Sequence, residues 1–166
     1  MYELKTLSKE AIPAALKSAE RYRILGEPLE AESICRDIME ADPDNQDALI
    51  LLFLSLTDLF KQQLNPNFTR AQEILERLKD RYCSAYYSGI LCECRAKVHL
   101  ESGLPGSGHL AYEWFRKAMD HYETALNYCS PENQDALLRW NTCARNLMSN
   151  ADLTPSQEYT GEQMLE

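Results

Sequence analysis

The sequence has few of the features that build a β-sheet. No stretch alternates steadily between apolar and polar residues, and neither Asn-Gly nor Asp-Gly, the dipeptides typical of hairpin turns, occurs. Apolar residues instead recur three and four positions apart along nearly the whole chain, which is the spacing of one helix face. We therefore expect an all-α fold.

Long apolar runs and a leader sequence are also missing. The most apolar run, residues 48–56, spans nine residues and is interrupted by Ser55, whereas a membrane-spanning helix needs about 20. The first residues, MYELKTLSKE, have no basic region followed by an apolar core, so they do not form a signal peptide. These observations predict a cytoplasmic protein with no membrane partner.

Basic residues are fewer than acidic ones. The chain has 17 Lys and Arg against 26 Asp and Glu, a net charge of −9, and it thus lacks the general basic excess that nucleic acids and anionic membranes attract. Its 166 residues correspond to one domain that buries about 70% of its unfolded surface. A basic ligand, or solubility alone, explains the acidity better than nucleic acid does.

Catalytic and metal-binding motifs are absent as well. The glycine-rich segment GLPGSGH, residues 103–109, has no Lys or Thr where a phosphate loop needs them, and no histidine belongs to an HExxH motif. The six cysteines are scattered, so we expect free thiols rather than a disulfide framework. We expect no catalysis, no metal and no cofactor. A small thiol- or metal-dependent sensor or enzyme using Cys92, Cys94 and His99 stays open as an alternative, although Cys92 and Cys94 lie about 200° apart on a helix.

The periodicity, interrupted by prolines and glycines, predicts seven helices arranged as pairs joined by short turns. The expected ranges are 12–26, 28–42, 44–63, 68–82, 84–101, 107–128 and 133–150. Asn65-Pro66-Asn67 is expected to break the chain, and Asp42 or Asp44 is expected to cap the third helix. The rings of Trp114 and Trp140 are expected in the core and that of Tyr86 in solvent.

One phrase of the sequence occurs twice. DPDNQDAL at residues 42–49 returns as SPENQDAL at residues 130–137. Pro43, a weaker break near Cys83, and Pro131 are separated by 40 and 48 residues, and self-similarity at this period is typical of stacked helix pairs. We interpret the phrase as the connection between pairs, with Ala48-Leu49 and Ala136-Leu137 packing inward.

Within the first pair, Ala19, Tyr22, Gly26, Glu30-Ala31 and Asp42-Pro43 have the spacing of a tetratricopeptide repeat, and the chain resembles that family over roughly residues 10–149. The resemblance implies an α-solenoid of three antiparallel helix pairs plus a C-terminal capping helix, wound as a right-handed superhelix. The domain is expected to cover residues 1–150, and residues 151–166 to form a polar, flexible tail.

The resemblance further implies a non-catalytic adaptor that binds a peptide or protein segment in a concave groove lined by the first helix of each pair. The residues that the resemblance places in the groove are Leu16, Glu20, Arg23, Ile50, Leu54, Thr57, Ser88, Cys92, Arg95, Leu138, Thr142 and Arg145. The apolar members would supply binding energy and the three arginines would orient a carboxylate.

Two points about partners follow from the same residues. Some members of the family clamp a C-terminal carboxylate with Lys and Asn of the first helix, where this chain has Leu16 and Glu20, so that partner is disfavoured. Self-association through exposed ends of the stack, giving a homo-oligomer, stays open as an alternative.

Overall fold

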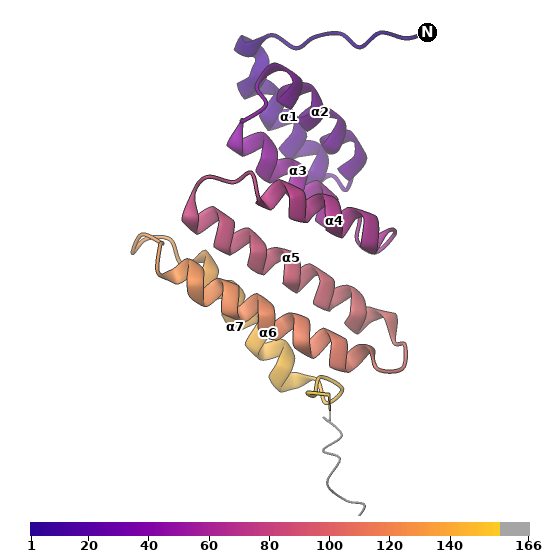
Figure 1. Cartoon of the computed structure of the whole chain (residues 1–166), viewed down its shortest axis with the longest axis vertical. Coiled ribbons are helices and arrows are strands. Elements are labelled where there is room, and N and C mark those ends of the chain that lie inside the picture. Colours follow the sequence, from indigo (N-terminus) through magenta and orange to yellow (C-terminus); the bar gives the residue numbers. More distant parts are fainter. Residues whose placement is uncertain (157–166) are drawn as a thin grey trace, which may run out of the picture.

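The protein is represented by a computed structural model, and its structure is described for residues 1–156. In this range the chain forms seven α-helices after a short 3-10 turn at Lys9–Ala11, and no strand, which confirms the expected all-α class. The helices are α1 (Ile12–Ile24), α2 (Pro28–Ala41), α3 (Gln46–Asp58), α4 (Leu64–Leu75), α5 (Arg81–Ser102), α6 (Ser107–Leu126) and α7 (Asp135–Ser149). Consecutive helices pack against one another and succeed one another along the long axis of the molecule (Figure 1).

Local chemistry explains several of the helix ends. Pro28 occupies the first turn of α2, where its missing N–H costs nothing. Gly26 and Gly103 follow α1 and α5 with φ of +79° and +61°, a backbone region that favours glycine. The side chain of Asp80 caps α5 by accepting a hydrogen bond from the backbone N–H of Cys83 at 2.8 Å.

The connection within the second pair, between α3 and α4, differs from the sequence prediction. Helix α3 ends at Asp58 rather than near residue 63, and α4 begins at Leu64. Asn65 and Pro66 therefore lie in the first turn of α4, a position that tolerates proline, and do not break the chain. The side-chain amide of Asn67, which is buried, donates to the Gln63 carbonyl at 2.9 Å and so stabilises this start.

The repeated phrase does open a helix each time, but its capping residue is neither of the expected acids. Asn45 caps α3, its side-chain oxygen accepting from the Ala48 N–H at 3.0 Å. At the equivalent position of the second copy, the oxygen of Asn133 accepts from the Asp135 N–H at 3.1 Å and from the Tyr82 hydroxyl at 3.2 Å. The shared asparagine thus accepts a backbone N–H at the start of the helix in both copies, although the N-cap position of α7 is Gln134.

The core follows the sequence pattern at most of the repeated and aromatic positions. Trp114 and Trp140, which were expected in the core, pack against it but remain half-buried. Ala48, Leu49 and Ala136 are fully buried as expected. Leu137, however, is 39% exposed because α7 is the last helix and only one of its sides is covered. Tyr86 was expected in solvent but is half-buried, with its ring stacked on that of Tyr82 at a centroid distance of 5.5 Å.

The chain after α7 is partly folded back, contrary to the expectation that the polar tail begins at residue 151. Leu153 is 5% exposed, and the Thr154 carbonyl lies 2.8 Å from Nδ1 of His109 at the start of α6. Gly108 makes this approach possible, since a Cβ there would collide with the Asp152 carbonyl. The rest of the predicted tail, residues 157–166, lies outside the described part of the chain.

Candidate functional site

The first helix of each pair and α7 are neighbours in one row. Arg23 of α1 reaches Asp58 of α3, with Nε 2.7 Å from Oδ2. The rings of Phe53 in α3 and Tyr87 in α5 meet edge to face at 5.7 Å. A charged contact described below joins α5 to α7 in the same way. We call the side of the molecule formed by α1, α3, α5 and α7 the first-helix face.

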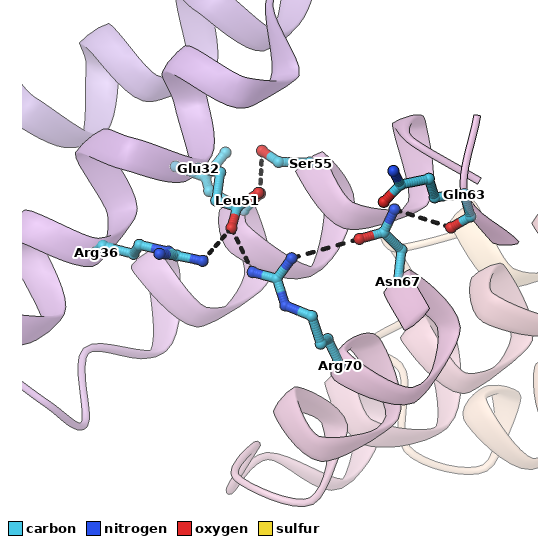
Figure 2. A network of polar contacts seen from close by, with 7 residues as sticks. All are labelled: Glu32, Arg36, Leu51, Ser55, Gln63, Asn67 and Arg70. Carbon is cyan, nitrogen blue, oxygen red and sulfur yellow. Dashed lines mark hydrogen bonds and ion pairs between the residues drawn. The ribbon is translucent and has the colours of Figure 1, made fainter. Parts of the chain in front are cut away.

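Helices α2, α4 and α6 form a second row. Glu32 of α2 is buried, and its carboxylate pairs with Arg36 of its own helix and with Arg70 of α4 (Figure 2). Arg70 also donates to the Asn67 side chain at 3.4 Å (Figure 2), so the network reaches the start of α4. The rings of Phe68 in α4 and Trp114 in α6 meet edge to face at 5.5 Å. We call this side the second-helix face.

The expected groove residues of α1 have different settings. Leu16 is half-buried and packs on the small apolar cluster of Ile12, Ile38 and Ala48, so it contributes to the core. Glu20 is exposed. Arg23 is held by Asp58, and burial raises the pKa of Asp58 although Arg23 opposes that shift.

The expected residues of α3 and the first one of α5 are mostly covered. Leu54 packs against the main core, and Ile50 is half-buried. Thr57 is 7% exposed and donates its hydroxyl to the Leu54 carbonyl at 2.8 Å. Ser88 does the same toward the Ser84 carbonyl at 2.7 Å. These hydroxyls are used within their own helices.

The expected residues of α7 are the most accessible ones. Leu138 is 59% exposed, and Thr142 and Arg145 are exposed on the following turns of the same helix. Residues four positions apart lie on the same side of a helix, so Leu138 and Thr142 belong to one strip. This strip is the part of the expected groove that a partner can reach directly.

The three arginines are not aligned as the sequence suggested. Arg23 is paired with Asp58, and Arg145 is exposed on α7. The guanidinium of Arg95 instead lies over the rings of Phe68 and Trp114, at 4.3 and 4.4 Å from their centroids. It therefore points toward the second-helix face. Cys92, three residues earlier and buried, shares that side of α5, so neither residue lines the first-helix face.

A buried carboxylate that the sequence reading did not single out lies between α5, α6 and α7. Glu93 is 1% exposed, and its Oε1 accepts from Lys97 at 2.5 Å and from Arg139 at 3.2 Å. Its Oε2 accepts from the Tyr122 hydroxyl at 2.6 Å. The signal available in the sequence was the pair Glu93 and Lys97, which stand four residues apart on a helix.

The environment of this carboxylate changes the acidity of its neighbours. Burial, reinforced by Glu93, raises the pKa of Tyr122 well above its usual range, so the phenol remains a hydrogen-bond donor. Burial alone would lower the pKa of Arg139, but the attraction of Glu93 outweighs it and the net shift is upward. The side chains of Lys97 and Arg139 remain 40% and 43% exposed. The network thus holds two cations where solvent, or a partner, can meet them.

Comparison with models of known protein families, with curated proteins and with solved structures found no match for this chain. Among residues 1–156, no helix is both long enough and apolar enough to span a bilayer.

The thiol and metal alternative gains no support from the geometry. Burial raises the pKa of both Cys92 and Cys94 to about 11, and a thiol that stays protonated is a poor nucleophile and metal ligand. Cys92 is close to Lys117 of α6, whereas Cys94 is close to Thr57 of α3, so the two thiols face different helices. In the described part of the chain, no three His, Cys, Asp or Glu side chains gather as a metal site would require.

The cysteines lead to a prediction about alkaline pH. All six are free, as expected, and burial raises the pKa of five of them from 9.0 to about 11 or 12, at positions 35, 83, 92, 94 and 143. A thiol whose pKa is higher in the folded state stabilises the fold fully below pH 9, and this contribution is lost as the pH rises toward 11 or 12. Under reducing conditions, the midpoint of urea unfolding should fall steadily above pH 9.

A double replacement provides the control for this prediction. In Cys92→Ala with Cys94→Ala, the decline above pH 9 should be shallower than in the wild type, because two of the five titrating thiols are gone. A midpoint that stays constant between pH 8 and pH 10.5 in the wild type would contradict the assignment.

Proposed function

We propose that this protein is a non-catalytic interaction module, similar to the tetratricopeptide repeat proteins, which binds a protein or peptide segment along its first-helix face. In this proposal, α1–α2, α3–α4 and α5–α6 are three stacked pairs of a right-handed solenoid and α7 is its cap. The six free thiols suit a reducing compartment, which agrees with a cytoplasmic location.

The observation that carries the proposal is the accessible strip on α7. Leu138 leaves 59% of its surface in water beside the exposed Thr142 and Arg145. An apolar side chain next to polar groups that can still form hydrogen bonds is what a partner needs for both affinity and orientation. The strip lies on α7, the last helix of the row formed by α1, α3 and α5, so we propose that an extended segment contacts several of these helices.

Charge on the same side supports a defined orientation of the partner. Lys97 and Arg139 are fixed by the buried carboxylate of Glu93, yet about two fifths of each side chain is exposed. Because the side chains are already ordered, a partner would lose little additional entropy by contacting them. Fixed charges of this kind contribute more to specificity and to the association rate than to affinity.

Charge-reversal and apolar-to-acid changes on α7 test the proposal. Leu138→Asp and Arg145→Glu alter exposed side chains, so they should leave the free energy of unfolding within about 0.5 kcal/mol of the wild-type value. Immobilised wild-type protein should capture from cell extract a partner that both variants lose. Arg116→Glu, an exposed position of α6, is the matched control and should retain it. A partner that all four proteins retain equally would overturn the assignment of the first-helix face.

A further inference from the structure

A second feature, on the opposite row, consists of cations packed on aromatic rings. The guanidinium of Arg95 lies 4.3 Å from the ring centroid of Phe68 and 4.4 Å from that of Trp114. Lys117 places its ammonium 4.3 Å from the centroid of the same Trp114 ring. We call Phe68, Arg95, Trp114 and Lys117 the cation–aromatic cluster. It joins α4, α5 and α6, and it plays no part in the first-helix face.

The two cations of the cluster have no acidic counterpart. Among residues 1–156, no carboxylate lies within 4.0 Å of the charged groups of Arg95 or Lys117. Glu113 stands four residues before Lys117 on α6, the spacing of a helical ion pair, yet forms none with it. Of the other 15 basic residues, seven are ion-paired: Arg23, Arg36, Lys61, Arg70, Lys79, Lys97 and Arg139.

Hydrogen-bonding capacity is left unused at the same place. Nε of Arg95 and Nε2 of His99 are both buried without a hydrogen-bond partner. Burial lowers the pKa of Arg95, and burial together with the nearby Arg95 lowers the pKa of His99. A desolvated cation without a counter-charge is unfavourable, and an anion bound beside it would relieve that cost.

We propose that the cation–aromatic cluster binds an acidic peptide segment, with a side-chain oxyanion held between Arg95 and Lys117 beside the Trp114 ring. The planar fork of arginine matches the two oxygens of a carboxylate or a phosphoryl group. Lys117 is exposed and Trp114 half-buried, so the cluster is open to solvent. A single oxyanion contact in an open site contributes little by itself, which is why the ligand is a peptide with several acidic groups and not a lone ion.

This site is independent of the proposed function, because it lies on the second-helix face. Loss of binding on the first-helix face would leave it intact, and the reverse also holds. An acidic ligand is unexpected for a chain of net charge −9, since the negative electrostatic field of the whole protein repels it. Only a local concentration of unpaired cations, such as this cluster, can favour such a ligand.

Nuclear magnetic resonance titration with defined probes tests the proposal. The chain has two tryptophans, and Trp140→Phe assigns the indole N–H signal of Trp114. Hexaglutamate peptide should shift that signal in a saturable manner, whereas hexaglutamine should not. Lys117→Gln should weaken hexaglutamate binding about tenfold or more. Arg116→Gln removes the same charge from the neighbouring exposed position of α6 and should weaken it less than threefold.

Two further probes and one further variant distinguish the sources of the oxyanion. A peptide of the same length with a single phosphoserine should bind through the same signals if a phosphoryl group is the better ligand, and more weakly than hexaglutamate if carboxylates are. Arg95→Gln, checked for retained helicity by circular dichroism, should abolish the shift. Equal effects of Lys117→Gln and Arg116→Gln, or no saturation with either acidic peptide, would overturn the site. Inorganic phosphate that binds as tightly as the peptides would overturn the assignment of a peptide ligand.

Discussion

Gly89→Ala is expected to lower the free energy of unfolding by about 2 kcal/mol, even though alanine favours helices more than glycine does. Gly89 is buried in α5, and an added Cβ would lie 2.5 Å from Cδ1 and 2.9 Å from Cζ of Tyr122. Tyr122 is fully buried and fixed by Glu93, so its ring has no room to withdraw. Overpacking of about 3 kcal/mol then exceeds the gain of about 0.5–1 kcal/mol in helix propensity. Urea unfolding followed by circular dichroism measures the difference.

A double-mutant cycle provides the control for this effect. Tyr122→Leu removes the ring that the new methyl group meets, at the cost of a cavity and a lost hydrogen bond. In that background Gly89→Ala should be neutral or stabilising, giving a coupling energy of about 2 kcal/mol. An equal loss in both backgrounds would show that the collision with Tyr122 is not the cause.

Glu93→Gln is expected to destabilise the protein by a similar amount, about 2 kcal/mol. Glutamine has nearly the same shape, but it has no negative charge to balance Lys97 and Arg139. Its amide also cannot accept hydrogen bonds from all three donors that now meet the carboxylate. Breaking a fully buried pair costs about 3–5 kcal/mol. The expected loss is smaller because Lys97 and Arg139 can turn their partly exposed side chains to water.

Glu101→Gln is the matched control for the buried carboxylate. Glu101 pairs with Lys61 at 2.8 Å, and both side chains are more than half exposed. An exposed pair contributes about 0–1 kcal/mol, so this change should shift the urea midpoint only slightly. If the two glutamines had equal effects, the network around Glu93 would not be a stabilising feature of the fold.

The helices and much of the core could be predicted because they depend on local spacing. Ala48 and Leu49 were placed correctly, as were Pro28 in the first turn of α2 and Gly26 after α1. These features follow from which side chains must leave water and which residues tolerate a helix end. The order of paired helices follows from the same pattern.

The candidate site could be predicted less well because it depends on how each helix is rotated about its axis. On α5 the sequence reading chose Arg95 for the first-helix face, whereas the structure directs Arg95 to Phe68 and Trp114 and uses Lys97, two residues later, beside Arg139. Two residues correspond to about 200° of rotation. Which rotation is adopted depends on contacts with α4, α6 and α7, and no local pattern encodes them.

The residue that caps α3 was also predicted incorrectly. Asp42, Asp44 and Asn45 are all suitable capping residues, and Asn45 was the one used for α3. Its amide also donates to the Asp42 carboxylate at 3.1 Å, so the neighbouring acid supports the cap without forming it. Composition indicates to within a few residues where a helix begins. Which of those residues caps the helix is determined by the backbone geometry.

The junction between α4 and α5 gives the molecule a mechanical property. The contact between these two helices is the smallest between any consecutive pair, whereas α5 and α6 form the largest. Tension applied at the two ends passes through every junction between consecutive helices, so the junction with the smallest contact would break first. The first four helices would then separate from the last three before either group loses its own packing. The contacts that would have to break include the ring pairs Phe53–Tyr87 and Phe68–Trp114, Arg95 on Phe68, and the ion pair Lys61–Glu101.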